Sequence, residues 1–248
     1  MRRRHLADRW NAHAFPMRSA VQMPSIVRPG ITTEIAVFDL DRTLIPGSSL
    51  VPFGRAAVRC GLARRRDLLR NALAAVAFQR RGLADAAIDR VQDRMLAVVA
   101  GQERDELAAV ASEVGRHLVD RAYPSARWLL DRHLAAGDFC IILTASPQEL
   151  ADAVAAGLGA HRAIGTRLAV EDGRLTGALE GIRCHGPGKL TRLRDEVGDV
   201  DWTKATAYGD SASDLPVLRS AAWPVAVNPD RELKTVAVQS GWPVLHLV

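Results

Sequence analysis

Cysteine is scarce in this chain of 248 residues, which contains only three, at Cys60, Cys140 and Cys184. They are far apart, odd in number, and form no CxxC motif or Cys/His cluster. This pattern argues against a disulfide framework and a structural zinc site, and it favours reduced thiols. Apolar stretches of the roughly 18 residues that a membrane span needs are also missing, as is the continuous apolar core of a secretory signal. We therefore expect a cytoplasmic protein without stable membrane insertion.

Excess positive charge is absent from most of the chain. The formal net charge is +5, but residues 1–30 contain six arginines and one aspartate, which account for all of it. The other 27 basic and 27 acidic side chains cancel. The folded part therefore gives no reason to expect a nucleic-acid partner. We interpret residues 1–30 as a basic tail that is disordered or precedes the true start, with an arm for nucleic acid or anionic lipid as the alternative.

Apolar runs and helical periodicity alternate over most of the sequence. A buried strand is predicted at 34–40, and residues 50–121 have the composition and spacing of about four helices. Beyond them, a turn at Glu171-Asp172-Gly173 predicts a hairpin within 163–179. The other strands are predicted at 139–143, 205–208, 223–227 and 244–247, and the helices at 125–136, 147–157, 188–197, after Ser213 and from Asp230.

This alternation predicts an α/β fold with a Rossmann-like, mostly parallel sheet covered by helices on both faces. The core would comprise residues 31–48 and 121–248. A helical bundle would be inserted as a cap at residues 49–120, directly after the first strand.

Reactive side chains occur where four separate strands or loops of this predicted core end or begin. Ligands of open parallel sheets bind outside the carboxyl ends of the strands, so these groups are expected to converge in one crevice. The spacing of two between the first pair of acids directs both to one side of an extended chain. The candidate residues are Asp39, Asp41 and Thr43, then Thr144 and Ser146, then Lys189, and finally Asp210, Ser211, Ser213 and Asp214.

These residue types fit phosphoryl transfer, in which negative charge must be positioned and neutralised. Asp39 is the candidate nucleophile, which would form an aspartyl-phosphate, and Asp41 the candidate acid and base. Asp39 and Asp210, with the backbone carbonyl of Asp41, offer oxygen ligands for Mg²⁺. Thr144 would donate a hydrogen bond to a phosphoryl oxygen, and Lys189 would add a positive charge.

With these motifs in order, the chain resembles the haloacid dehalogenase superfamily of aspartate-dependent phosphatases from about Ile31 to its C-terminus. Asp39-Leu40-Asp41-Arg42-Thr43 resembles the first motif, Thr144 the second, Lys189 the third, and Gly209-Asp210 through Asp214 the fourth. The resemblance implies the same roles for Asp39, Asp41, Thr144 and Lys189, with Asp210 as a Mg²⁺ ligand supported by Asp214.

The position of the helical insertion, the Asp172-Gly173 hairpin and Cys184-x-Gly186 resemble the phosphoserine phosphatase-like subgroup, subfamily IB. In that subgroup the cap closes over the core and helps to select the substrate. Its members that act on phosphoserine place a glutamate, which binds the substrate's ammonium, where Ser48 stands in this chain. A neutral hydroxyl cannot replace that charge, so we expect a different substrate.

Several alternatives remain open at the level of sequence. Asp210 or Asp214 would also suit the start of the following helix, and Ser146 would suit a helix N-cap before Pro147 as well as a phosphate contact. Our first hypothesis is a Mg²⁺-dependent phosphatase acting on a small phosphomonoester, either a metabolite or a lipid head-group phosphate. The alternatives are a phosphotransferase or phosphomutase with the same intermediate, and a catalytically inactive protein that binds a phosphorylated ligand.

Overall fold

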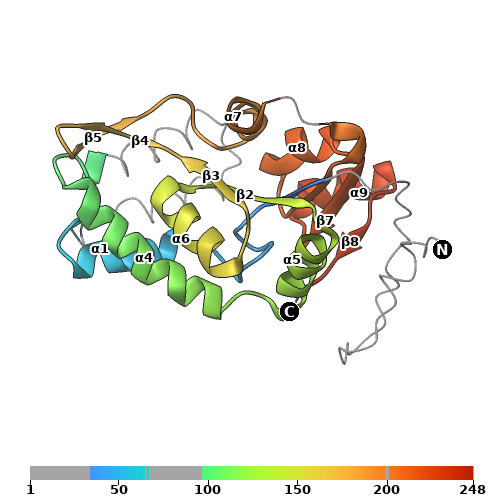
Figure 1. The fold of residues 1–248 in the computed structure, drawn as a ribbon, viewed down its shortest axis with the longest axis horizontal. Coiled ribbons are helices and arrows are strands. Elements are labelled where there is room, and N and C mark those ends of the chain that lie inside the picture. The colour runs from blue at the N-terminus through green and yellow to red at the C-terminus, as the bar shows by residue number, and fades with distance from the viewer. Residues whose placement is uncertain (1–33, 65, 67–96, 199–200, 248) are drawn as a thin grey trace.

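The computed structural model describes residues 34–64, 66, 97–198 and 201–247. Its centre is a six-stranded sheet with the order β3-β2-β1-β6-β7-β8 (Figure 1). Every neighbouring pair of these strands is parallel, which confirms the predicted α/β fold. The strands are β1 (Ile35–Phe38), β2 (Phe139–Pro147), β3 (Arg162–Thr166), β6 (Thr206–Gly209), β7 (Trp223–Val227) and β8 (Val244–Leu245).

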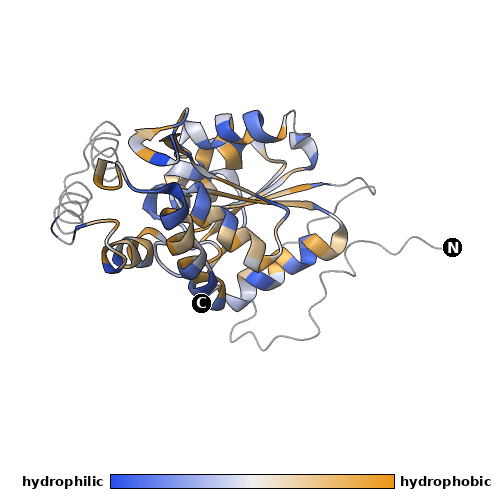
Figure 2. Ribbon diagram, turned by 60° about the vertical axis from the view of Figure 1, so that its left-hand side comes forward, coloured by the Kyte–Doolittle hydropathy of each residue, from blue (hydrophilic) through white to orange (hydrophobic). Residues whose placement is uncertain are grey.

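Helices cover both faces of the sheet, because successive residues of its buried strands point to opposite sides. Phe38 packs in a hydrophobic cluster with Leu130 of α5 (Pro124–Ala136), and α6 (Gln148–Leu158) contributes to the same cluster. Val37 belongs instead to a cluster with Leu233 of α9 (Arg231–Ser240), together with α7 (Pro187–Val197) and α8 (Leu215–Ser220). Hydrophobic colouring accordingly follows the strands between the two helical layers (Figure 2).

The order of the strands brings three carboxyl ends together. β1 lies between β2 and β6, although β2 and β6 are far apart in the sequence. The strand order therefore reverses at β1, and ligands of open α/β sheets bind at such a point. Asp39 follows β1, Thr144 lies in β2, and Asp210 follows β6.

Two local predictions were wrong. β2 extends to Pro147 instead of ending at Leu143, so Thr144 and Ser146 lie in the strand rather than in a loop. The pairing with β3 resumes after a register shift between Leu143 and Pro147, which keeps this stretch in the sheet. Pro147, not Ser146, is consequently the N-cap of α6.

The second correction concerns the predicted hairpin at 163–179. Its first part is β3, which joins the parallel sheet, and the hairpin itself consists of β4 (Leu168–Glu171) and β5 (Arg174–Leu179). The predicted turn is confirmed, because Asp172 and Gly173 have φ of 48° and 78°. Two consecutive positive φ angles are typical of the type I′ turn that suits a two-residue hairpin.

Two helices of the predicted cap lie within the described residues, α1 (Leu50–Arg59) and α4 (Arg104–Asp120), whereas the predicted helices between them lie largely outside. α4 packs closely on α6, because a Cβ on Gly115 would lie 2.6 Å from the Cβ of Ala153. Its first residue is hydrogen-bonded to the hairpin, with 2.9 Å from Arg104 N to Gly173 O. α4 is thus joined to core elements along its side and at its N-terminus.

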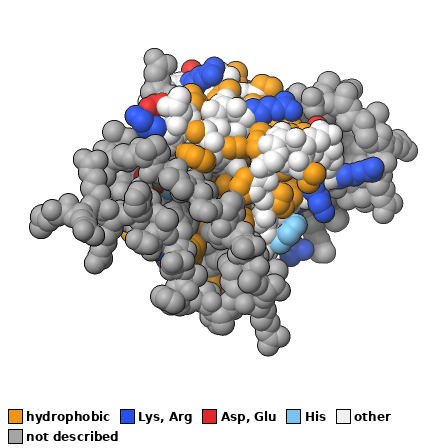
Figure 3. Space-filling view, turned by 90° about the vertical axis from the view of Figure 1, so that its right-hand side faces the viewer, with side chains coloured by type: hydrophobic (Ala, Val, Ile, Leu, Met, Phe, Trp, Pro, Cys, Tyr) orange, Lys and Arg blue, Asp and Glu red, His pale blue; other side chains and the backbone are white. Residues whose placement is uncertain are grey.

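Figure 3 shows how charged and hydrophobic side chains are distributed on one face of the molecule. On the described part of the face in Figure 3, hydrophobic side chains separate the lysines and arginines, which form no continuous basic patch. Among the helices of the described ranges, none has both the length and the apolarity that crossing a membrane requires.

The contact between α4 and α6 gives a first prediction. Gly115→Ala adds a methyl group that overlaps Ala153, and overpacking outweighs the gain in helix propensity, so we expect a loss of stability of about 1 to 2 kcal/mol. Urea unfolding of the variant measures it. Ala153→Gly in the same chain makes room for the methyl group, so the double variant should lose less than the sum of the single losses. Strict additivity would show that this contact is not tight.

Candidate active site

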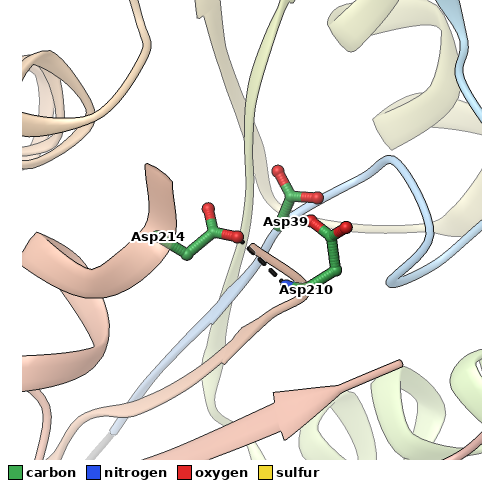
Figure 4. A group of neighbouring side chains, drawn as sticks. All are labelled: Asp39, Asp210 and Asp214. Carbon is green, nitrogen blue, oxygen red and sulfur yellow. Dashed lines mark hydrogen bonds between the residues drawn. The ribbon is translucent and has the colours of Figure 1, made fainter. Parts of the chain in front are cut away.

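Three buried aspartates meet where β1 and β6 end. Carboxylate oxygens of Asp39, Asp210 and Asp214 all lie within 4.8 Å of one another (Figure 4). The exposed fractions are 7% for Asp39, 6% for Asp210 and 3% for Asp214. Like charges so close together and so well buried require a compensating cation.

Lys189 at the start of α7 supplies part of that compensation. Its ammonium Nζ lies 2.5 Å from Asp39 Oδ1 and 2.6 Å from Asp214 Oδ1, and only 2% of the residue is exposed. Burial acts to lower the pKa of Lys189, but the charges of Asp214 and Asp39 outweigh it and raise that pKa. The lysine therefore stays protonated, and it joins the third predicted motif to the first and the fourth.

Asp214 is held in place by the backbone of its own loop. Its Oδ2 accepts hydrogen bonds from the N–H groups of Asp210, at 3.0 Å, and Ser211, at 3.1 Å. The chain can bend this closely because residue 209 is glycine, since a Cβ there would lie 2.6 Å from the Cβ of Asp214. Both carboxylate oxygens of Asp214 are thus engaged, and the Ser211 and Ser213 hydroxyls bond each other at 2.9 Å beside it.

The electrostatics of the group match its burial. Burial raises the pKa of Asp39, and Lys189 opposes that effect. Burial, followed by the charge of Asp214, raises the pKa of Asp210 to about 7, while Arg42 acts in the opposite direction. Perturbed carboxyl groups of this kind concentrate at functional sites.

Asp41 belongs to the same site but has different partners. Its Oδ1 accepts a hydrogen bond from Ser49 N at 2.9 Å, and its Oδ2 accepts one from the Ser48 hydroxyl at 3.2 Å. Burial nevertheless raises the pKa of Asp41, because it outweighs these hydrogen bonds. The carboxyl group can thus hold a proton more readily than an exposed aspartate does.

Hydroxyl groups from β2 and from the loop after β1 complete the site. The Ser146 hydroxyl lies 2.6 Å from that of Ser49, which links the end of β2 to the loop after β1. Thr144 Oγ1 accepts a hydrogen bond from Ser146 N at 3.2 Å. The Thr43 hydroxyl is buried and has no hydrogen-bond partner among the described residues. A buried hydroxyl without a partner in this loop is consistent with a bound ligand.

Sequence reasoning missed the contacts of two residues, Arg42 and Ser49. Arg42 Nε lies 3.1 Å from Asp210 Oδ2, and its guanidinium also donates to the carbonyl of Asn228. Arg42 and Asp210 are 168 positions apart, and no local pattern indicates such a pair. For Ser49, the Pro46-Gly47 turn that leads the chain back towards Asp41 was the available signal.

The carboxylate group has the chemistry of a site for a divalent metal ion. Hard cations such as Mg²⁺ prefer carboxylate oxygens. Lys189 and the backbone occupy both oxygens of Asp214, whereas Lys189 contacts Asp39 at Oδ1 and Arg42 contacts Asp210 at Oδ2. The donor set therefore fits a cation held mainly by Asp39 and Asp210.

Comparison with known proteins assigns the family. The sequence matches the haloacid dehalogenase-like hydrolase family over residues 36–219, which is well over half of the chain. The protein therefore belongs to this family of hydrolases, and the resemblance seen in its motifs is confirmed.

The relatives include proteins named as phosphatases. A phosphoserine phosphatase of Mycobacterium tuberculosis is 36% identical over 218 residues, which cover 86% of this chain and 70% of that protein. A histidinol-phosphatase of Neisseria meningitidis is 33% identical over 219 residues, with 86% and 98% covered. An inhibition of morphological differentiation protein of Streptomyces azureus is 35% identical over 214 residues, with 85% and 77% covered. The expectation of a phosphatase-type hydrolase is confirmed at the level of the family.

Solved structures agree on the fold. A protein of unknown function from Bordetella pertussis Tohama I superposes with a TM-score of 0.76 at 30% identity, covering 86% of this chain and 99% of its own. A phosphoserine phosphatase with an analogue of its phospho-aspartyl intermediate gives 0.59 at 17% identity, covering 87% and 94%. At that identity the second match supports the fold alone.

The ion pairs of Lys189 with Asp39 and Asp214 lead to a second prediction. Lys189→Met leaves buried carboxylates without their counter-charge, so we expect the free energy of unfolding to fall by about 3 to 5 kcal/mol at pH 8. Lys189 opposes the burial that raises the pKa of Asp39 and Asp210, so its removal raises those pKa values further and the folded variant takes up protons at a higher pH than the wild-type protein does. The loss should therefore shrink as the pH falls towards 5.5.

Chemical unfolding of both proteins between pH 5.5 and 8 measures this effect. Lys204→Met is the matched control, because Lys204 forms an exposed pair with Asp201 and its removal should change stability little at any pH. Equal losses in the two variants, or a loss that does not depend on pH, would contradict the predicted role of Lys189.

Proposed function

We propose that this protein is a Mg²⁺-dependent phosphatase that hydrolyses a small phosphomonoester through an aspartyl-phosphate on Asp39. The observation that carries the proposal is the convergence of Asp39, Asp210, Asp214 and Lys189 at the carboxyl ends of β1 and β6. Phosphoryl transfer requires this combination of an oxygen nucleophile, a cation-binding set and a fixed positive charge.

Asp39 is the nucleophile of the proposal. Lys189 binds Asp39 Oδ1 and thereby fixes the orientation of the carboxylate. One carboxylate oxygen attacks phosphorus while the bond to the leaving oxygen breaks, so the phosphoryl group moves to Asp39. Water then attacks phosphorus, and cleavage of the acyl-phosphate linkage returns the carboxylate and releases inorganic phosphate.

Asp41 is the acid and base of the proposal. The raised pKa of its carboxyl group favours a proton that Asp41 can deliver to the leaving alcohol oxygen. The resulting carboxylate can then accept a proton from the attacking water. Hydrogen bonds from Ser49 N and Ser48 keep Asp41 in one orientation during both steps.

The metal-binding set consists of the carboxylates of Asp39 and Asp210 and the backbone carbonyl of Asp41. When bound there, Mg²⁺ would supply positive charge that neutralises the phosphoryl oxygens. Asp214 supports the set, because it holds Lys189 and is itself held by the backbone N–H groups of Asp210 and Ser211. Ser211 and Ser213 stabilise the same turn.

The phosphoryl group would be bound by Thr43, Thr144, Ser146 and Lys189. The hydroxyl of Thr43 lacks a partner among the described residues, and that of Thr144 accepts from Ser146 N and so retains its own proton for donation. Ser146 Oγ shares a hydrogen bond with Ser49, and this contact joins the end of β2 to the loop after β1. Donors fixed in advance stabilise developing negative charge without reorganisation.

The substrate differs from phosphoserine in this proposal. Ser48 contacts Asp41, so it lies beside the proposed acid, and it carries no charge that would attract an ammonium group. It also lines a cavity of about 580 Å³ together with Arg55, Arg59 and Arg121. Glu113 is the acidic residue of that lining, and Arg59 pairs with it. These surroundings favour a neutral or anionic substrate over a cationic one.

The third prediction tests the chemistry. Release of phosphate from a panel of phosphomonoesters should be abolished by EDTA and restored by Mg²⁺. Asp39→Asn should lower kcat by about a thousandfold or more, because the nucleophile is lost. The control is Asp195→Asn, which removes an exposed carboxylate of α7 and should leave the rate unchanged.

Two outcomes would count against this mechanism. Turnover that persists in Asp39→Asn excludes Asp39 as the nucleophile. Transfer of the phosphoryl group to an added alcohol in preference to water identifies a phosphotransferase that uses the same intermediate. Analysis of the products with and without the alcohol distinguishes hydrolysis from transfer.

The fourth prediction concerns Ser48. The wild-type protein should not prefer phosphoserine to 3-phosphoglycerate, which carries a hydroxyl in place of the ammonium group. Ser48→Glu introduces a carboxylate there and should raise the kcat/KM ratio of phosphoserine to 3-phosphoglycerate about fivefold, the value of a partly exposed charge pair. Ser48→Gln is the control of similar size without the charge. An equal change in both variants would show that residue 48 acts through its size.

A further inference from the structure

Three buried polar side chains form a hydrogen-bonded chain on the side of the sheet that α5 covers. Nδ1 of His133, on α5, is 2.7 Å from Asp138 Oδ2, and Nε2 of His133 is 2.8 Å from the hydroxyl oxygen of Tyr208. The exposed fractions are 1% for His133, 4% for Asp138 and 4% for Tyr208. Burying such groups costs free energy that apolar side chains would not cost. The proposed catalytic residues do not include any of the three.

Tyr208 connects this chain to both strands that carry the proposed metal ligands. Its ring stacks on Phe38 with centroids 4.5 Å apart and planes 5° apart, and Phe38 directly precedes Asp39. Its backbone carbonyl accepts a hydrogen bond from Asp39 N at 2.9 Å. Tyr208 is also only two residues before Asp210. One side chain thus adjoins the ends of β1 and β6.

The hydrogen bonds restrict Tyr208 more than packing alone would. A tyrosine ring held only by apolar neighbours can slide along Phe38. The hydrogen bond to His133 limits this movement, because the Tyr208 hydroxyl must stay within reach of His133 Nε2 while the ring stays stacked on Phe38. Asp138 in turn fixes the imidazole of His133. Any shift of this chain would move the backbone that carries Asp39 and Asp210.

We propose that His133 and Asp138 are positioning residues that act through Tyr208 to fix the separation of the Asp39 and Asp210 carboxylates. The inference rests on the proposed function, because that separation matters for holding Mg²⁺. Partners outside the ligand set commonly change metal affinity by about 10-fold to 100-fold when they are altered. The effect should therefore appear in metal binding before any substrate is present.

The fifth prediction is a measurement of Mg²⁺ binding to the full chain by isothermal titration calorimetry. Tyr208→Phe removes one oxygen and keeps the stacked ring, and it should raise the Kd for Mg²⁺ about tenfold. His133→Gln should raise it similarly. The double variant should raise the Kd by less than the product of the two single effects, because both substitutions break the same hydrogen bond between His133 and Tyr208.

Val154→Ala is the control for loosening of the core. Val154 is fully buried on α6 in the same hydrophobic cluster, so this variant should lose thermal stability without a change in the Kd for Mg²⁺. The inference is overturned if Tyr208→Phe binds within twofold of wild type, or if Val154→Ala weakens binding equally. Should His133→Gln fail to fold, the comparison of Tyr208→Phe with Val154→Ala still decides. A wild-type protein that binds no Mg²⁺ overturns the proposed function as well.

Discussion

Three carboxylates with oxygens within 4.8 Å of one another are the constraint around which this structure is organised. At an effective dielectric constant of about 20, two unit charges at that separation repel by about 3 kcal/mol. Burial adds the cost of removing each charge from water. Lys189 offsets part of both effects, because its ammonium group contacts Asp39 and Asp214 together. Asp210 has a partly exposed arginine, Arg42, as its counter-charge, and this leaves the group short of positive charge.

The scaffold can hold such a group because three strand ends meet at the point where the strand order reverses. Hydrogen bonds hold these segments in place. Asp214 accepts from the backbone of its own turn, and the Ser49 and Ser146 hydroxyls join the loop after β1 to the end of β2. Arg42 and Asn228 exchange side-chain to backbone hydrogen bonds, and Arg42 also contacts Asp210. These hydrogen bonds between neighbouring segments thus oppose the repulsion among the acids.

The sequence indicated the parts of the structure that depend on local pattern. Apolar runs located the strands, Gly and Pro located the turns, and the spacing of two placed Asp39 and Asp41 together. The extension of β2 was missed because Thr144-Ala145-Ser146-Pro147 has the composition of a turn, whereas pairing with β3 keeps it extended. The hydrogen-bonded chain of His133, Asp138 and Tyr208 depends on packing between α5 and β6. No local sequence pattern predicts these hydrogen bonds.

Chemistry and substrate choice have separate physical origins in this protein. The acids, Lys189 and the hydroxyl groups act on the phosphoryl group, which every phosphomonoester shares. The relatives named phosphoserine phosphatase and histidinol-phosphatase are 36% and 33% identical to this chain, so family membership alone does not select between such substrates. Selection must come from side chains beyond the phosphoryl group. Ser48 is the described residue that contacts Asp41 and also lines a cavity with arginines on its wall, so it lies where the two functions meet.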